Sequence, residues 1–392
     1  MVTAKTTQSG AKKVRQPTLQ LVFLIQALRG GGAERILQTL AEYFREQGHQ
    51  VTVFTLEAPD QAYELDPKIL VRPFFTSRLC RGPGRLLLLP MQVVELATRL
   101  CFMRWDTLCS FMFRANFVAI LTGLLGFRRP LVITEHVPPT SFYSWGSLKG
   151  RVMLSMTRAL YPLAQRIQVV SESIKDSLTS LGVPPHLVVV IPNAVNVEKT
   201  RCLARDEHGL HQWIQTRPTI VNVGSLAILK GQANLIRAVS LVRKEVDVQL
   251  LIVGKGPEET SLRLLISELG LQNDVRLALW QKNPFAICKS CQVFAFSSLF
   301  EGFGLAIVEA MCCGLPIVTT SCWNGREDIL QDGISGLVVP VDDPKMLAAS
   351  LLRVLKDEAL AKQLSLGAEE RARIYDIEKI GPVFLDFLTR PL

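Results

Sequence analysis

Short apolar runs alternate with amphipathic stretches along most of the chain. Residues 19–25 form the first run, and apolar residues at helical spacing follow between residues 36 and 44. A second apolar run at residues 51–54 completes a strand–helix–strand unit, which predicts a parallel sheet. Further strands are predicted at residues 107–111, 131–134, 167–171, 188–193, 219–223, 251–253, 293–298 and 315–319. The pattern therefore predicts an α/β protein.

The length of the chain predicts more than one domain, because 392 residues exceed what a single core usually holds. We expect a disordered basic tail at residues 1–18, a first domain at 19–196, a second at 197–374 and a closing helix at 375–392. The polar segment at residues 198–215 is the predicted linker region.

The positive charge is concentrated in the first half of the chain. The net charge is +9, and residues 1–200 hold 23 Lys+Arg against 13 Asp+Glu. This excess indicates an anionic partner, such as phospholipid, lipid pyrophosphate or nucleic acid. The alternative is charge that only maintains solubility, for which an even distribution along the chain would be expected.

One apolar segment has four flanking arginines, Arg81, Arg85, Arg99 and Arg104. It could lie on a membrane as an amphipathic element, or it could be an internal helix that packs on the sheet. Pro90 and Glu95 interrupt it, so it does not predict a membrane span.

The cysteines do not predict a metal or disulfide framework. Nine cysteines lie at scattered spacings without a signal peptide, which is typical of reduced thiols in a cytosolic protein. Cys288 and Cys291 form a lone C-x2-C pair, for which a plain structural role is the simpler interpretation.

Residues 300–314 carry the clearest candidate chemistry. They lie between two apolar runs, so the segment predicts strand, glycine loop, helix and strand. Gly302 and Gly304 let the backbone approach a ligand, and the helix that begins near Gly304 directs its free N–H groups at an anion. Glu301 in the loop and Glu309 in the helix face the same pocket, where carboxylates accept hydrogen bonds from sugar hydroxyls. The combination suits a sugar nucleotide.

The letters E-G-F-G-L-A-I-V-E at residues 301–309 resemble the E-x7-E signature of retaining, family-four type GT-B glycosyltransferases. The resemblance implies two Rossmann-like domains that face each other across a cleft. It also implies that Glu301 binds the donor hexose, that Glu309 binds the ribose, and that the backbone of Phe303, Gly304 and Leu305 contacts the sugar. The plainer alternative is a chance pair of glutamates with Glu301 as a helix cap.

The second domain extends the resemblance. Residues 224–231 are similar to the family pattern G-R-L-x3-K-G, in which Arg and Lys clamp the diphosphate. Lys230 matches the clamp lysine after Gly224, but Ser225 stands where the arginine is expected, so one charge is missing. Gly254 and Gly256 resemble the family's G-x-G-P turn near the nucleotide.

Two further features of this domain follow from the same resemblance. The nucleobase is expected near Trp280 and Gln281. Residues 324–329 and 332–336 resemble the family's closing loops.

The first domain supplies the remaining candidates. Gly31 and Gly32 belong to a G-G-A-E turn that, in the resembled family, approaches the donor phosphates or the acceptor. His136 follows a predicted strand, where family members carry a histidine that contacts the donor sugar. The aromatic loop at residues 138–145 is expected to form an acceptor-side wall.

The glycine run at residues 30–32 also permits a dinucleotide-binding interpretation. Glu57 would then hold a ribose. The third glycine of G-x-G-x-x-G is replaced by Arg35, which weakens that interpretation.

The expected function is retaining transfer of a hexose or N-acetylhexosamine. The donor is a nucleoside diphosphate sugar, with UDP favoured over GDP, and the acceptor is lipid-linked or a polysaccharide. We expect no metal and no cofactor apart from this donor, no nucleic acid partner, and a cytoplasmic location, peripheral on the inner face of the plasma membrane. A nucleotide-sugar epimerase of the same fold and a catalytically silent binding protein remain alternatives.

Overall fold

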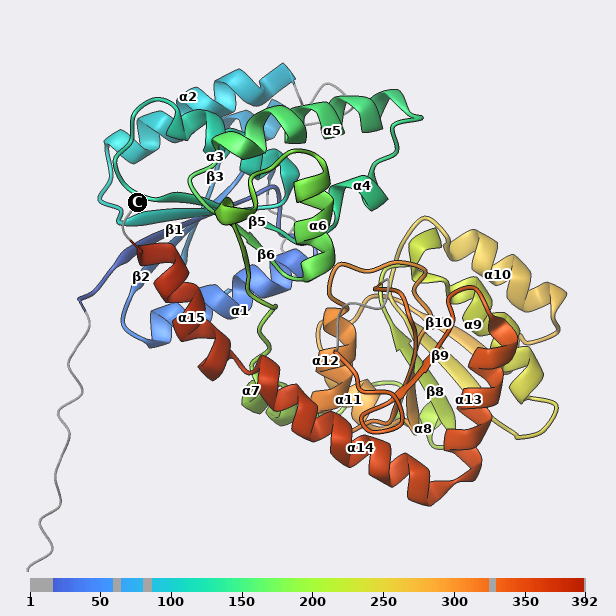
Figure 1. Cartoon of the computed structure of the whole chain (residues 1–392). Helices are drawn as coiled ribbons and strands as arrows, with labels where there is room; N and C mark the ends of the chain where they lie inside the picture. Colours follow the sequence, from blue (N-terminus) through green and yellow to red (C-terminus); the bar gives the residue numbers. More distant parts are fainter. Residues whose placement is uncertain (1–16, 59–64, 80–86, 324–328, 391–392) are drawn as a thin grey trace, which may run out of the picture.

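The computed structural model describes residues 17–58, 65–79, 87–323 and 329–390. Two parallel sheets, each covered by helices on both faces, form the two halves of the molecule (Figure 1). Most of the predicted tail, the flanking residues Arg81 and Arg85, and residues 324–328 of the predicted closing loop at 324–329 lie outside the described part.

The first half is built on a sheet of seven strands in the order β3-β2-β1-β4-β5-β6-β7, and every pairing in it is parallel. The strands are β1 (Gln20–Ile25), β2 (Gln50–Thr55), β3 (Leu70–Pro73), β4 (Thr107–Phe111), β5 (Leu131–Glu135), β6 (Ile167–Val169) and β7 (Val188–Val190).

The second half is built on a sheet of six strands in the order β10-β9-β8-β11-β12-β13, again with parallel pairings throughout. The strands are β8 (Thr219–Val223), β9 (Gln249–Val253), β10 (Val275–Ala278), β11 (Val293–Phe296), β12 (Ile317–Thr320) and β13 (Leu337–Val339).

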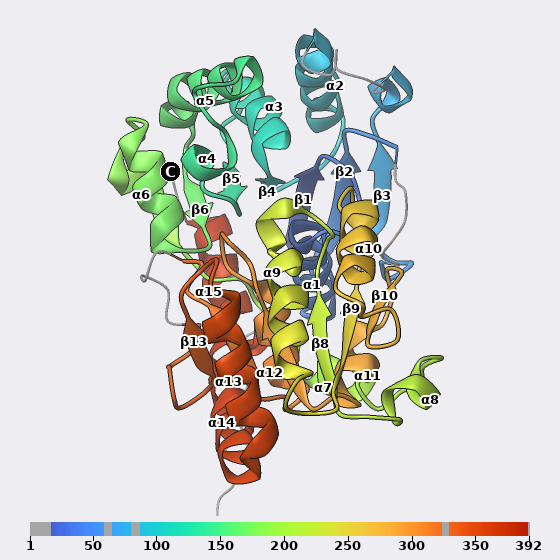
Figure 2. The ribbon, with the colours of Figure 1, turned by 90° about the vertical axis from the view of Figure 1, so that its right-hand side faces the viewer.

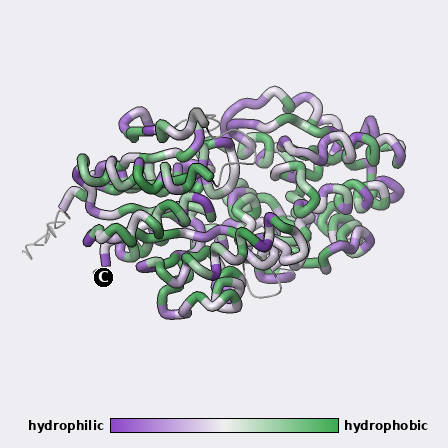
Figure 3. The backbone as a smooth tube through the Cα atoms, turned by 90° about the horizontal axis from the view of Figure 1, so that it is seen from above, coloured by the Kyte–Doolittle hydropathy of each residue, from purple (hydrophilic) through white to green (hydrophobic). Residues whose placement is uncertain are grey.

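Alternate residues of β1 face two different helix layers, as the period of a strand requires. Leu21 and Phe23 pack with α1 (Gly32–Glu46) and α15 (Ile377–Thr389), and Val22 and Leu24 pack on the side of α2 (Leu89–Cys101) and α3 (Phe113–Gly123). Hydrophobic stretches run through both halves of the molecule (Figure 3). The central strands are therefore buried on both faces.

The second sheet has the same three-layer arrangement. One face packs against α9 (Gln232–Val242), α10 (Glu259–Glu268) and α13 (Pro344–Lys356). The other packs against α11 (Pro284–Lys289), α12 (Leu305–Cys312) and α14 (Glu358–Ala372). The other α-helices of the described residues are α4 (Pro139–Phe142), α5 (Leu148–Leu160), α6 (Glu172–Ser180), α7 (Val197–Leu203) and α8 (His211–Ile214).

The chain crosses between the halves twice, and the two crossings pair with each other. The N–H of Val195 donates to the carbonyl of Tyr375 at 2.8 Å, and the N–H of Ile377 donates to the carbonyl of Val195 at 3.0 Å. Helix α15 then packs on α1, where the rings of Phe44 and Phe384 lie 6.4 Å apart. The last helix is therefore part of the first half of the molecule.

Helix α2 contains most of the described part of the arginine-flanked apolar segment. Its buried face, with Leu89, Leu96 and Leu100, packs against α3. The guanidinium of Arg99 lies 5.0 Å from the ring centroid of Phe54 and pairs with a glutamate of its own helix. The inward face of the segment is thus a core element.

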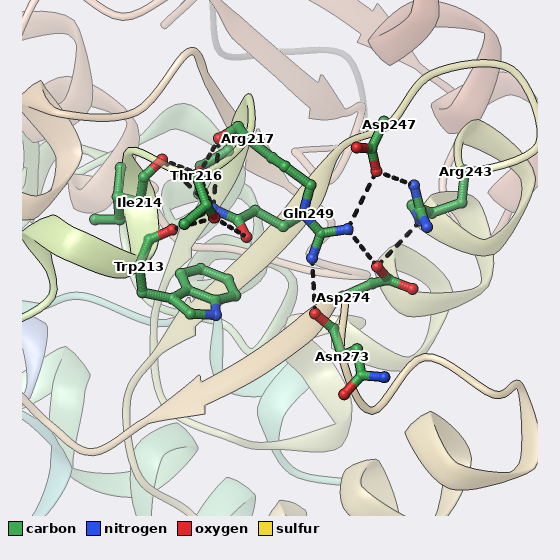
Figure 4. Close-up of polar contacts among 10 residues, drawn as sticks. Trp213, Ile214, Thr216, Arg217, Arg243, Asp247, Gln249, Asn273 and Asp274 are labelled. Atoms are coloured by element: carbon green, nitrogen blue, oxygen red, sulfur yellow. Dashed lines mark hydrogen bonds and ion pairs between the residues drawn. The ribbon is translucent and has the colours of Figure 1, made fainter.

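A polar network lies at the start of the strands of the second sheet (Figure 4). Arg217 donates to Asp274 at 2.6 Å and to the carbonyl of Asn273 at 2.8 Å, and Arg243 also contacts Asp274 at 3.2 Å. Because this network lies at the amino end of the strands, it stabilises the second half without facing the region where parallel sheets bind ligands.

Candidate functional site

The cavity that brings the candidate residues together lies between the two halves, at the carboxyl ends of their strands. The strand order reverses between β1 and β4 in the first sheet and between β8 and β11 in the second, which is where parallel sheets bind ligands. A cavity of about 570 Å³ is lined by residues that follow all four strands. Its size suits a small-molecule ligand. Figure 2 shows the helices and strands of the two halves from a second side.

Nearly all of the predicted site residues line this single cavity. They are Gly31, Gly32, His136, Gly224, Ser225, Lys230, Gly254, Glu301, Phe303, Gly304, Leu305 and Glu309. Gly256 is the exception: a Cβ there would lie 2.2 Å from the carbonyl oxygen of Leu226, so this glycine lets two loops pack closely behind the cavity wall.

The glycine loop before α12 needs its glycines for two physical reasons. A Cβ on Gly302 would lie 2.0 Å from the carbonyl oxygen of His136, so this glycine lets the two domains touch. Gly304 has a φ of 83° and precedes the first residue of α12. The indole N–H of Trp323 donates to the carbonyl of Phe303 at 3.1 Å and holds the loop. Trp323 was not predicted, because nothing in its local sequence indicates this contact.

Lys230 and Glu301 form an ion pair in the cavity wall. The distance from Lys230 Nζ to Glu301 Oε1 is 2.5 Å, and the hydroxyl of Ser298 donates to the same oxygen at 2.8 Å. The hydroxyl of Ser297 donates to the carbonyl of Lys230 at 3.0 Å and fixes the lysine backbone. The predicted diphosphate cation and the predicted hexose-binding carboxylate are therefore direct neighbours.

Glu309 pairs with a residue of the opposite domain. Arg35 Nη1 lies 3.0 Å from Glu309 Oε1, and the guanidinium lies 5.1 Å from the ring centroid of Phe285 in α11. Burial raises the pKa of Glu309, and the neighbouring Arg35 acts in the opposite direction. Arg35 entered the sequence analysis only as a missing glycine, and its contact with Glu309 was not predicted.

His136 faces the cavity as a neutral imidazole. Its ring stacks on Phe111, with centroids 5.8 Å apart, and Nε2 lies 3.1 Å from the hydroxyl of Thr134. Because that hydroxyl donates its proton to the carbonyl of Ser110, it accepts the proton of Nε2. Burial lowers the pKa of His136 to about 4, although the Asn193 side chain acts in the opposite direction, so the ring is uncharged near pH 7.

Glu135, the residue before His136, lies in a buried network. The hydroxyl of Tyr161 donates to its carboxylate at 2.6 Å, and the backbone N–H groups of His136 and Val137 donate to it at 3.0 and 3.3 Å. Burial raises the pKa of Glu135 to about 7 in spite of these hydrogen bonds. This carboxyl group thus fixes the backbone that carries His136.

Glu57 does not take the position that the dinucleotide interpretation needs. Its carboxylate is buried and pairs with Arg29 at 2.6 Å and with Arg114 at 2.9 Å. Both carboxylate oxygens are therefore engaged by arginines, which counts against a ribose contact there.

The predicted base and acceptor residues also border the cavity. Trp280 and Gln281 lie in its wall, as does Phe142 of the aromatic loop. The ring of Phe142 stacks on Phe113, with centroids 6.3 Å apart. The base and acceptor assignments remain predictions.

This set of groups can bind an anionic sugar derivative. The N-terminus of α12 and the cations in the wall favour a diphosphate, and the two carboxylates can accept hydrogen bonds from hydroxyl groups. Two facing Rossmann-like domains around such a cavity define a GT-B protein.

Comparison with protein-family models gives the family. The model "Glycosyl transferases group 1" matches residues 205–371, and the model "Glycosyltransferase Family 4" matches residues 30–199. The chain belongs to the family-four type of GT-B glycosyltransferases.

Two relatives come from Campylobacter jejuni. N-acetylgalactosamine-N,N'-diacetylbacillosaminyl-diphospho-undecaprenol 4-alpha-N-acetylgalactosaminyltransferase is 28% identical over 372 residues, which cover 94% of this chain and 99% of the relative. GalNAc-alpha-(1->4)-GalNAc-alpha-(1->3)-diNAcBac-PP-undecaprenol alpha-1,4-N-acetyl-D-galactosaminyltransferase is 23% identical over an alignment that covers 95% of this chain and 98% of the relative.

A third relative matches over a shorter stretch. Lipopolysaccharide core biosynthesis glycosyltransferase LpsD of Rhizobium meliloti is 34% identical over 44% of this chain and 49% of the relative.

Solved structures confirm the GT-B fold. Anabaena HepE in complex with UDP and glucose superposes with a TM-score of 0.76 at 21% identity, covering 95% of this chain and 99% of that chain. WaaG, a glycosyltransferase involved in lipopolysaccharide biosynthesis, superposes with a TM-score of 0.72 at 14% identity, covering 94% and 99%.

Proposed function

We propose that this glycosyltransferase moves a hexose or N-acetylhexosamine, with retention, from a nucleoside diphosphate sugar to a lipid-linked or polysaccharide acceptor. The observation that carries the proposal is the cavity in which the Lys230–Glu301 pair and the N-terminus of α12 meet neutral His136 of the other domain. The two Campylobacter relatives, whose names specify undecaprenol diphosphate acceptors, support this acceptor class.

The proposed roles follow from charge and position. The diphosphate lies against the N-terminus of α12 and Lys230, where positive charge stabilises the departing nucleoside diphosphate. Glu301 accepts hydrogen bonds from the hexose, Glu309 from the ribose, and His136 contacts the donor sugar. No metal is needed for this charge balance, so transfer should survive excess EDTA.

Retention of configuration is supported by the linkages of the relatives. Both Campylobacter names specify an alpha linkage, and an α product from an α-linked donor is net retention. The anomeric proton coupling of the isolated product tests this directly. A β product from an α donor would contradict it.

The donor and the reaction can be tested together. UDP and GDP sugars that carry glucose, galactose, N-acetylglucosamine or N-acetylgalactosamine are incubated with the protein and a mixture of lipid diphosphate acceptors. We expect transfer from a UDP sugar. Conversion of the donor sugar without an acceptor would favour the epimerase. Stabilisation by the donor without any product would favour the silent binding protein, since a ligand at 100 times its dissociation constant adds about 2.7 kcal/mol.

We also propose that the first domain docks reversibly on the inner face of the plasma membrane, where a lipid-linked acceptor would be reached. No helix in the described ranges is long and apolar enough to cross a membrane. The outer face of α2 carries exposed Met91 and Val94, and exposed Leu87 and Phe102 flank the helix. These side chains, with the basic excess of residues 1–200, support docking on anionic lipid, where each basic residue adds about 1 kcal/mol.

Cosedimentation with neutral and anionic vesicles at low and high salt tests the docking. We expect binding to anionic vesicles that weakens with salt and is lost on Leu87→Ser plus Phe102→Ser. Leu264→Ser, at an exposed apolar position of the second domain, is the matched control. Equal recovery in the supernatant with both lipids would remove the proposal.

A further inference from the structure

The diphosphate clamp of this chain lacks a cation at Ser225. The serine follows β8, lines the cavity and is exposed. Its carbonyl accepts a hydrogen bond from the Gln232 side chain at 2.9 Å, so the loop is held and cannot move far toward another cation. Any second positive charge for a diphosphate therefore has to come from a different part of the wall.

Four cationic side chains of the described residues line the cavity, and three of them already pair with carboxylates. The three pairs are Arg29–Glu57, Arg35–Glu309 and Lys230–Glu301. The fourth cation, Lys255, forms no ion pair with any described residue and is exposed to the cavity. The Arg35 and Lys230 pairs are close to neutral. Glu57 is shared by Arg29 and Arg114, so that group keeps one net positive charge, but of the four cavity cations Lys255 alone has no carboxylate partner among the described residues.

Lys255 also lies beside the loop that lacks the charge. The N–H of Leu226, the residue after Ser225, donates to the carbonyl of Lys255 at 3.1 Å, and the N–H of Gly224 donates to the carbonyl of Val253 at 3.0 Å. The two loops are therefore joined by backbone hydrogen bonds on both sides of Ser225. The ammonium of Lys255 lies 5.9 Å from the ring centroid of Trp280, another residue of the cavity wall.

We propose that Lys255 binds the donor diphosphate and supplies the positive charge that is missing at Ser225. The inference rests on the proposed function, because it assigns a residue to the same donor site. It predicts that a cation at position 225 can replace the cation at position 255, since both loops face the same part of the cavity.

The test is calorimetric titration of the full chain with UDP and with uridine, and with GDP, ADP and their nucleosides in parallel. In Lys255→Gln the dissociation constant for the diphosphate should rise on the order of tenfold or more, the scale of one hydrogen bond to a charged group, while nucleoside binding stays unchanged. Adding Ser225→Arg to Lys255→Gln should restore diphosphate affinity. Lys244→Gln, at an exposed lysine beyond the far end of α9, is the matched control and should change neither affinity.

The outcomes separate this inference from the proposed function. Unchanged diphosphate affinity in Lys255→Gln, while the parent protein binds the diphosphate, would overturn the role of Lys255 alone. Equal losses for nucleoside and diphosphate would also overturn it, because Lys255 would then contact the base beside Trp280. A parent protein that binds none of the three diphosphates would overturn the proposed donor site and this inference with it.

Discussion

Arg35 of the first domain and Glu309 of the second form an ion pair across the cavity, with Nη1 and Oε1 3.0 Å apart. Both side chains are largely buried, so the pair is shielded from solvent. If Glu309 binds the donor ribose, its carboxylate is oriented by the domain that does not carry it, and Arg35 opposes the rise in its pKa that burial causes. Arg35 would then be a positioning residue for donor binding.

Arg35→Ala should raise the Michaelis constant for the donor, as Glu309→Ala should, with a smaller change in turnover. Without Arg35 the pKa of Glu309 should rise further, because burial is no longer opposed, so the loss of donor affinity should be larger at low pH than at high pH. Steady-state kinetics between pH 5.5 and 8.5 measures this. Arg45→Ala in the last turn of α1 is the control, and a pH-independent loss in Arg35→Ala would contradict the positioning role.

Glu301→Ala should lower turnover much more than donor affinity. A contact to the reacting hexose tightens in the transition state, whereas a ribose contact is made equally in the ground state. Comparing kcat and the donor KM of Glu301→Ala with those of Glu309→Ala is the measurement. The opposite pattern would mean that the two carboxylates have exchanged roles.

Lys230→Ala should reduce the rate on the order of 10²-fold or more, the scale for removing one preorganised electrostatic group. Single-turnover kinetics at saturating donor isolates this step. Loss of Lys230 also leaves Glu301 without its ion-pair partner, so Lys230→Arg is a useful comparison that keeps the charge. A normal rate in Lys230→Ala would remove this residue from the chemistry.

Glu135 should make stability depend on pH. Its pKa in the folded protein is about 7, against an ordinary value of 4.5. Between these values the unfolded chain has lost the proton that the folded protein keeps, so stability falls as pH rises from about 4.5 to 7. Thermal unfolding of Glu135→Gln and the parent is measured from pH 5 to 8. The Tm of the variant minus the Tm of the parent should increase as the pH rises. A constant difference would contradict the raised pKa.

The strands were predictable where the chain carries uninterrupted apolar runs, and β4 and β8 begin and end where the sequence predicts. Strand β3 was missed because it is a short edge strand that contains Arg72 and Pro73, which an edge tolerates. The predicted linker at residues 198–215 is not all loop, because it contains most of α7. Asn196 starts that helix: its side chain caps the N-terminus by accepting the N–H of Lys199 at 2.8 Å.

The candidate site was predictable where its residues lie close together in sequence. Glu301, Gly304 and Glu309 belong to one loop and helix, so local pattern alone places them near one another. The contact between Arg35 and Glu309 joins residues 274 positions apart. Such a contact depends on how the two domains pack, which no local spacing encodes. The role proposed for Lys255 could not be predicted for the same reason. It depends on which carboxylates the other cavity cations pair with, and those ion pairs are known only from the folded structure.

Helix α15 also bears on how the chain is made in the cell. Phe384 and Phe387 cover the aromatic cluster around Phe44 of α1, yet they follow the whole second domain in the sequence. We therefore expect the first domain to complete its folding only after the second domain has been synthesised. A first domain produced by itself should expose that cluster and aggregate, and residues 375–390 would have to be fused to it. The two domains of this transferase cannot be separated by a single cut.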